Sequence, residues 1–264
     1  MRTLFIGDVV GTPGVSFCRR AVPVLRARDG LDVVVANAEN ATNGSGLCPR
    51  DYRHLRAAGV DAVTLGDHIY KKFDIAEVLN DPTEPVCKPA NYPTVAPGRD
   101  HVLLAVGGVT VAVISLMGRT YMRAVDCPFA AVDRVLAALA GRVNVIIVDV
   151  HAEATADKYQ LLYHLDGRVT AVIGTHTHVP TADEHVTAKG TAFQCDAGMT
   201  GPYAGVLGRR ADRVVHAART FEPTPFDVAT GDVRLGGVIV DCDTNTGRAT
   251  AVRRLCVREA EVGV

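Results

Sequence analysis

Residues 143–153, with the sequence VNVIIVDVHAE, form a β-branched apolar run that ends in Asp149 and His151. Apolar runs of this length and composition are typical of strands that are buried on both faces of a sheet. Comparable runs recur at 4–6, 33–36, 62–65, 102–106, 109–114, 171–173 and 238–240. The repeated pattern predicts a central sheet whose strands come from the whole length of the chain.

Segments with helical patterning separate many of these predicted strands, at 15–28, 50–58, 74–80, 128–140, 153–165 and 211–219. Strands that alternate with helices predict a layered α/β fold in which helices cover the sheet. Within 15–28, Pro23 predicts a kink or a late start of the helix. Gly107-Gly108 lies between two apolar runs and predicts a β-hairpin, so we expect a mixed sheet.

The rest of the sequence is consistent with one domain over residues 1–264. The stretch 82–97 is rich in proline and predicts a long surface loop or a small subdomain. Residues 237–257 predict two strands around a turn at 243–247. The sequence contains no linker, no low-complexity stretch and no repeat of fixed period.

Composition excludes some classes of function. The chain has 28 basic and 29 acidic side chains, which argues against the basic footprint of a nucleic-acid-binding protein. Trp is absent and aromatic residues are few, which disfavours a stacking platform for single-stranded nucleic acid. A small-molecule substrate or a protein partner stays open.

The cysteines and the N-terminus predict the compartment. Seven cysteines are scattered without a C-x-x-C pair, a pattern typical of reduced thiols. The first residues enter a predicted strand almost at once, without the apolar region of a signal peptide, and no apolar run reaches the length of a membrane span. We therefore expect a soluble, cytoplasmic protein.

Side chains of the kind that bind metals follow five of the predicted strands. In open α/β sheets, ligands bind outside the carboxyl ends of the strands, where such groups can meet in one crevice. The side chains that we expect to converge there are Asp8, Glu39, Asn40, Asp67, His68, His151, His176 and His178.

Each cluster is weak evidence when taken alone. Asp8 after a strand is more often a turn or helix-capping residue than a ligand, and Glu39-Asn40 is as readily a polar pair in a loop. His176-x-His178 is the strongest signal, because two imidazoles around one residue are an uncommon choice for packing. A purely structural explanation would need five independent coincidences at equivalent strand ends, so we favour a shared site.

The ligand types indicate the class of metal. Carboxylates, an amide and imidazoles without a set of thiolates suit Mn, Fe or Zn better than an iron–sulfur cluster. The candidate ligands outnumber those of one tetrahedral zinc, and two ions that share a bridging carboxylate explain the number more simply. Such pairs, about 3.5–4 Å apart, promote in-line displacement at phosphorus. The predicted metal ligands are Asp8, Glu39, Asn40, Asp67, His151, His176 and His178.

At this point the sequence resembles the YmdB-like family of calcineurin-type metallophosphoesterases. The matching stretches run in order along nearly the whole chain: LFIGDVVGTPG (4–14), VVANAENATNGSG (34–46), VTLGDH (63–68), KPANYP (88–93), VAVISLMGR (111–119), DCPF (126–129), VDVHAEATADK (148–158), LDGRVTAVIGTHTHVPTADE (165–184) and DAGMTGPY (196–203). The combination of HAEAT, GTHTHV-x-TADE and GMTGPY is highly specific.

The resemblance implies a four-layer αββα sandwich with a dimetal site at the strand ends. By the family pattern, one metal is held by Asp8, Glu39, Asn40 and His178, and the other by Glu39, Asp67, His151 and His176, with Glu39 as the bridge. His68 is implied to be the general acid that protonates the leaving oxygen, or to steady the phosphate. The family's activity implies hydrolysis of cyclic nucleotides, with iron or manganese in the site and zinc as an alternative.

The sequence departs from the family pattern at two positions. The family usually has Asn where this chain has Asp67, and commonly has an acidic residue where this chain has Lys71. Asp67 keeps an oxygen ligand and adds a negative charge, which we expect to hold the ions more tightly and to weaken the attraction for an anionic phosphate. The alternative is a substitution that the site simply tolerates.

Other classes of protein fit less well. The glycines after the first strand have the spacing G-x-x-x-G-x-x-G, which is not a dinucleotide-binding fingerprint. The sequence contains neither a P-loop nor a G-x-S-x-G motif. A phosphomonoesterase on the same metals, or a metal-bound regulatory protein with little turnover, stays open. Arg119 and the loop 196–208 are candidates to shape the substrate pocket, and a homo-oligomer is compatible with the sequence.

The function that we predict is hydrolysis of a phosphodiester by a metal-bridging hydroxide that attacks in line. The reaction class follows from the paired metals, and the substrate class, a cyclic nucleotide, follows from the resemblance. His68 assists the departure of the alkoxide.

Overall fold

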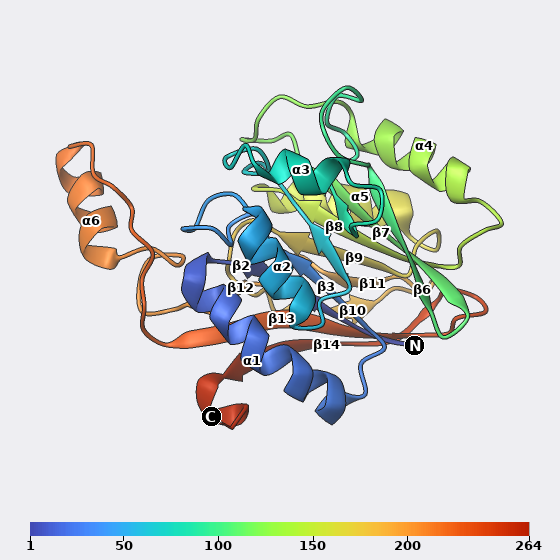
Figure 1. Cartoon of the computed structure of the whole chain (residues 1–264). Coiled ribbons are helices and arrows are strands. Elements are labelled where there is room, and N and C mark those ends of the chain that lie inside the picture. Colours follow the sequence, from blue (N-terminus) through green and yellow to red (C-terminus); the bar gives the residue numbers. More distant parts are fainter. Residues whose placement is uncertain (264) are drawn as a thin grey trace.

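Two β-sheets stack face to face and carry helices on their outer surfaces (Figure 1). This arrangement is seen in a computed structural model, which describes residues 1–263. In the described part of the chain, no helix is both long enough and apolar enough to cross a membrane. The four layers are those of an αββα sandwich, as predicted.

The first sheet combines parallel and antiparallel strands. β1 pairs in parallel with β3 and antiparallel with β13. The strand order is β2 (Asp8–Val9), β12 (Met199–Pro202), β13 (Val233–Cys242), β1 (Arg2–Ile6), β3 (Val33–Asn37), β4 (Ala62–Thr64) and β5 (Val86–Cys87), with β14 (Ala249–Arg258) paired to β13. The mixed sheet is therefore confirmed.

The second sheet is also mixed and contains the hairpin predicted at Gly107-Gly108. β7 and β8 run in parallel, and β6 and β7 form the antiparallel hairpin. The strand order is β10 (His185–Val186), β11 (Ala192–Gln194), β9 (Ala171–Thr175), β8 (Val145–His151), β7 (Val109–Met117) and β6 (His101–Val106).

Helices form the two outer layers. α1 (Gly11–Asp29), α2 (Pro49–Ala57) and α3 (Ile75–Asn80) pack on the first sheet, and α4 (Pro128–Leu139) and α5 (Thr155–Leu165) pack on the second. A short 3₁₀ helix, η1 (Glu259–Glu261), follows β14. α6 (Ala211–Thr220) projects away from the body, and none of its residues is buried (Figure 1, orange).

The first helix differs from its prediction. It begins at Gly11 and continues through Pro23, so the predicted late start is wrong. Pro13 lies in the first turn, where backbone N–H groups have no partner within the helix and a proline is tolerated. Ala21, Val22 and Leu25 are buried in the core, and their packing offsets the stability that is lost because Pro23 cannot donate a backbone hydrogen bond.

Alternation along the strands positions the site. In β8, Ile146, Val148 and Val150 face the helices, whereas Val145 and Ile147 face the other sheet. Because side chains alternate along a strand, Asp149 and His151 extend the row that faces the other sheet. The same alternation directs Asn37 of β3 into this layer between the sheets, so the polar ends of facing strands meet there.

Candidate metal centre

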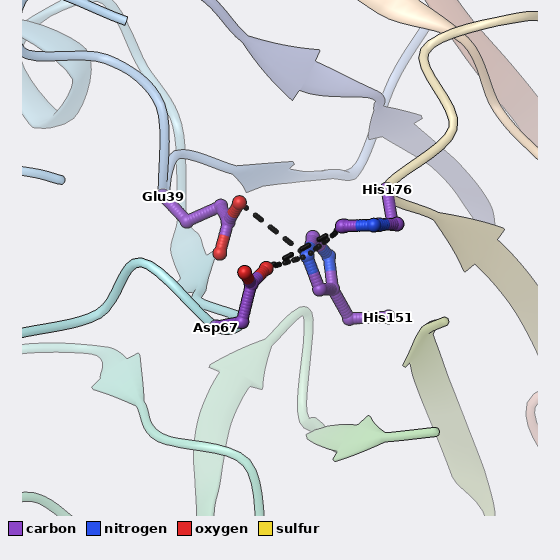
Figure 2. Close-up of side chains that lie close together, drawn as sticks. All are labelled: Glu39, Asp67, His151 and His176. Atoms are coloured by element: carbon purple, nitrogen blue, oxygen red, sulfur yellow. Dashed lines mark hydrogen bonds and ion pairs between the residues drawn. The ribbon is translucent and has the colours of Figure 1, made fainter. Parts of the chain in front are cut away.

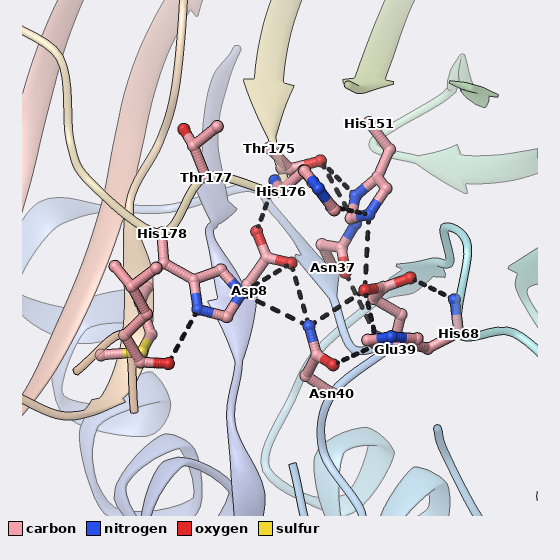
Figure 3. Close-up of polar contacts among 12 residues, drawn as sticks. Asp8, Asn37, Glu39, Asn40, His68, His151, Thr175, His176, Thr177 and His178 are labelled. Carbon is pink, nitrogen blue, oxygen red and sulfur yellow. Dashed lines mark hydrogen bonds and ion pairs between the residues drawn. The ribbon is translucent and has the colours of Figure 1, made fainter. Parts of the chain in front are cut away.

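Five strand ends bring the predicted site residues to one region at the edge of the layer between the sheets (Figure 2 and Figure 3). Asp8 follows β1, Glu39 and Asn40 follow β3, Asp67 and His68 follow β4, His151 ends β8, and His176 and His178 follow β9. The structure therefore brings together every residue of the predicted set, in two neighbouring groups.

His151 is the centre of the more compact group. Its Nε2 lies 3.0 Å from Asp67 Oδ1, 3.1 Å from His176 Nδ1 and 3.4 Å from Glu39 Oε1. One ligand atom of each of these four residues lies within 4.8 Å of the others (Figure 2). The four side chains thus enclose one small space.

The chemistry of this group fits a metal ion. A ring nitrogen carries at most one hydrogen, so Nε2 of His151 cannot donate to two carboxylates and to a second imidazole nitrogen. Glu39 and His151 are fully buried, where unpaired charges and lone pairs are costly. A cation bound by two imidazole nitrogens and two carboxylate oxygens would satisfy all four side chains.

Gly66 is needed for this arrangement. A Cβ atom at Gly66 would lie 2.3 Å from a ring carbon of His151. Any side chain there would push the imidazole away from Asp67. The glycine before Asp67 and His68 is therefore part of the site.

Asp8, Asn40 and His178 form the looser group, beside Glu39. Asn40 Nδ2 donates to Glu39 Oε1 at 3.0 Å and lies 3.5 Å from Asp8 Oδ1. Nε2 of His178 lies 3.5 Å from Asp8 Oδ1. Glu39 contacts both groups, and this position suits a bridging carboxylate.

His68 lies beside both groups and opens toward solvent. Its Nδ1 lies 2.7 Å from Asn40 Oδ1 and 3.3 Å from Glu39 Oε1, and its backbone N–H donates to Glu39 Oε2 at 2.9 Å. The hydrogen bond to Glu39 raises the pKa of the imidazole, against the opposing effect of burial. The ring is therefore anchored through Nδ1, and its Nε2 lies 3.7 Å from Asp67 Oδ2.

The buried acids and histidines shift one another's pKa values. Burial would raise the pKa of Glu39, but His151 and His68 lower it to about 2. Burial would lower the pKa of His151, but Glu39 and Asp67 raise it well above 6.5. In the protein without metal, a proton on His151 therefore offsets part of the charge of these carboxylates.

The loop between the last two histidines has an unfavourable backbone. His176 and His178 have φ values of 95° and 64°, in the left-handed region that residues other than glycine avoid. Such conformations cost about 1–3 kcal/mol each and persist where surrounding contacts enforce them. Here Asp196 Oδ2 accepts hydrogen bonds from the backbone N–H of Thr177 at 3.1 Å and from its hydroxyl at 2.7 Å.

A buried ion pair supports this loop. Lys158 Nζ lies 2.8 Å from Asp196 Oδ2, and both side chains are almost completely buried. Neither residue was among the predicted ligands, although Asp196 begins the loop 196–208 that was predicted to shape the pocket. A signal was available for Lys158, since it occupies the same helical face as Leu161, Leu162 and Leu165, where an apolar residue is expected.

A cavity of about 320 Å³ opens onto the two groups. Glu153 and Arg209 line it and were not among the predicted site residues, and Glu153 Oε2 lies 3.1 Å from His176 Nε2. Of the predicted pocket loop 196–208, Leu207 lines the cavity, whereas Arg119 is not among the lining residues. Arg119 instead donates its backbone N–H to Asp157 Oδ2 at 2.8 Å.

Relatives of known name cover nearly the whole chain. A 2',3'-cyclic-nucleotide 2'-phosphodiesterase of Bacillus subtilis (strain 168) is 41% identical over 259 residues, which are 98% of this chain and 98% of that protein. A putative phosphatase/phosphodiesterase of Mycoplasma genitalium is 31% identical over 97% of this chain and 92% of its own length.

Solved structures have the same fold. A hypothetical protein from Thermus thermophilus is 41% identical, with a TM-score of 0.92 over 98% of this chain and 100% of that one. A novel phosphatase from Mycoplasma pneumoniae is 30% identical, with a TM-score of 0.91 over 98% of this chain and 93% of that one. The family model described as YmdB-like protein matches residues 4–255. The chain therefore belongs to the YmdB-like protein family and is a phosphoric ester hydrolase that carries a candidate metal site.

Proposed function

We propose that this chain hydrolyses 2',3'-cyclic nucleotides by breaking the bond between phosphorus and the 2' oxygen. The observation that carries the proposal is the compact group around His151 Nε2, of which Glu39 and His176 line the same cavity as His68. The name of the Bacillus subtilis relative supports the substrate class. A cavity of about 320 Å³ falls within the lower range of small-molecule sites.

The proposed ligands divide between two metal ions. His151, His176 and Asp67 would hold one ion, Asp8, Asn40 and His178 the other, and Glu39 both. When bound, such ions lower the pKa of a water molecule and offset negative charge on the phosphoryl oxygens. Nitrogen and oxygen ligands without thiolates favour iron or manganese, with zinc as the alternative.

His68 would supply the proton for the leaving oxygen. Because Nδ1 is anchored by Asn40 and Glu39, the proton that moves would be the one on Nε2. The raised pKa of His68 increases the fraction of the ring that is protonated at neutral pH. The oxygen of water bonds to phosphorus as the bond to the 2' oxygen breaks, and the 2' oxygen takes the proton of His68. The proton that the water loses passes to solvent, His68 regains a proton from solvent, and the product is a nucleoside 3'-phosphate.

We also propose that the protein works in the cytoplasm. All seven cysteines are free thiols, which supports a reducing compartment. This proposal is independent of the reaction.

Identification of the products tests the proposed activity. Metal-loaded protein would be incubated with adenosine 2',3'-cyclic phosphate, and the products separated by chromatography, with p-nitrophenyl phosphate as the monoester control. We expect adenosine 3'-phosphate as the main product and slow turnover of the monoester. Faster hydrolysis of the monoester would instead identify a phosphomonoesterase, and no turnover of either substrate would favour a regulatory protein.

A further inference from the structure

A buried polar cluster lies behind the metal centre, between the two sheets. Asn37 and Thr64 come from β3 and β4 of the first sheet, and Asp149, His151 and Thr175 come from β8 and β9 of the second. All five residues are fully buried. Buried polar groups need hydrogen-bond partners, so the donors and acceptors of this cluster can be assigned one by one.

Asp149 accepts the hydrogen bonds of this cluster. Its Oδ1 receives the hydroxyl of Thr175 at 2.7 Å. Its Oδ2 receives the hydroxyl of Thr64 at 2.5 Å and Nδ2 of Asn37 at 3.0 Å. Burial raises the pKa of this carboxyl group to about 6, but the three donors directed at it favour the ionised form, which can only accept and which prevails at neutral pH.

The hydroxyl of Thr175 determines where His151 carries its proton. A hydroxyl has one hydrogen, and here Asp149 receives it. Nδ1 of His151 lies 2.9 Å from the same hydroxyl oxygen, so the ring must be the donor in that contact. Asn37 Nδ2 is farther from Nδ1, at 3.3 Å, and its hydrogen bond to Asp149 is the shorter one.

A proton on Nδ1 leaves the lone pair of Nε2 directed at the compact group. This lone pair faces Asp67 Oδ1 at 3.0 Å and Nδ1 of His176 at 3.1 Å. We propose that Asp149 and Thr175 are positioning residues, which fix the orientation and the tautomer of His151 so that Nε2 can bind a cation. This inference rests on the proposed function in one respect, because it treats His151 as a metal ligand.

Strand register makes this arrangement rigid. Thr175 pairs directly with His151 in the parallel ladder between β8 and β9. Asp149 precedes His151 by two residues on the same strand, so both side chains extend from the same face. The hydrogen-bonded backbone of two central strands thus holds the carboxylate, the hydroxyl and the imidazole in line.

Thr175→Val is the direct test, because it keeps the shape of the side chain and removes its hydroxyl. Thr64→Val is the matched control, since it removes another hydroxyl from the same carboxylate without touching His151. Thr175→Ser restores the hydroxyl. Partners behind a metal-binding histidine typically contribute about 10–100-fold in metal affinity. We expect a loss of that size in Thr175→Val, little change in Thr64→Val and recovery in Thr175→Ser, measured by manganese or zinc competition with a chromophoric chelator.

A second measurement reads the tautomer of His151 directly, in the wild type first. Nitrogen-15 NMR of histidine-labelled, metal-free wild type distinguishes a ring protonated at Nδ1 from one protonated at Nε2. At a pH at which His151 is neutral, we expect its proton on Nδ1 in the wild type and a mixture of tautomers in Thr175→Val.

Each outcome separates this inference from the proposed function. A proton on Nε2 in the wild type, or equal losses of affinity in Thr175→Val and Thr64→Val, would overturn the positioning role even if both proteins hydrolyse the diester. If the wild type bound no metal, the proposed function would fail, while the tautomer would still decide whether Thr175 directs His151.

Discussion

The two groups of the candidate metal centre differ in how many of their polar atoms can form hydrogen bonds within the group. Nε2 of His151 lies 3.0–3.4 Å from atoms of Asp67, His176 and Glu39, and the single hydrogen that this nitrogen can carry cannot pair with all three. In the group of Asp8 and His178, Nδ2 of Asn40 points inward and donates to the carboxylates. The first group therefore needs added positive charge, either a proton on His151 or a metal ion, whereas the second is partly satisfied by the Asn40 amide.

This difference predicts two metal affinities. An amide binds a metal through its oxygen, but Oδ1 of Asn40 is turned toward Nδ1 of His68, 2.7 Å away. Loading the second group would require the amide to rotate and to give up its hydrogen bonds. We therefore expect the first ion to bind at His151 and the second to bind more weakly at Asp8 and His178.

Glu39→Ala should have the largest effect, because Glu39 is the side chain that the two groups share. We expect loss of both ions and loss of turnover, measured by elemental analysis and by hydrolysis of bis-p-nitrophenyl phosphate. Glu77→Ala, which changes an exposed side chain on α3, serves as the control and should keep both. Full metal occupancy in Glu39→Ala would refute its role as the bridge.

Two histidine variants distinguish metal binding by the compact group from metal binding by the looser group. His176→Ala should remove the tighter binding step, since its Nδ1 faces His151 Nε2. His178→Ala should remove only the weaker step, because its Nε2 lies beside Asp8. Manganese titration followed by calorimetry would show which step disappears. Identical titrations of the two variants would mean that the groups do not act as separate sites.

His68→Ala should leave metal binding by both groups unchanged and should slow the reaction. Loss of a general acid typically costs about 10²–10⁴-fold in rate. Elemental analysis of the variant should match the wild type while turnover falls within that range. If the variant instead lost metal, His68 would have to be counted among the ligands of one group.

The smallest expected effect is a pH dependence of the metal-free protein. The pKa of His151 is raised well above 6.5 by Glu39 and Asp67, so its contribution to stability is complete below pH 6.5 and is lost as pH rises through the raised pKa. Thermal denaturation with a chelator should show Tm falling above pH 6.5, by about 2–4 °C for each kcal/mol lost. Metal-loaded protein should not show this fall, and equal slopes with and without metal would contradict it.

The sequence predicted the convergence of the site because that convergence follows from topology. Asp8, Glu39, Asp67, His151 and His176 each stand at the end of a buried strand. Three of these strands belong to the first sheet and two to the second, and their carboxyl ends meet at one edge of the layer between the sheets. The layered fold was predictable for the same reason, from apolar runs that alternate with helical segments.

Contacts that cross between elements were not predictable. Thr175 supports His151 only because the ladder between β8 and β9 pairs these two residues, and a local pattern does not specify that register. Asp196 anchors Thr177 through a loop nearly twenty residues away in sequence. The inward direction of the Asn40 amide likewise depends on His68 and Glu39 together.

Metal stoichiometry against activity tests the central claim most directly. Metal-free protein would be titrated with manganese while bound metal and hydrolysis of bis-p-nitrophenyl phosphate are followed in the same samples. We predict about two ions per chain in two steps, with turnover that rises only with the second. Saturation at one ion, or turnover that is complete without metal, would contradict a two-metal phosphodiesterase.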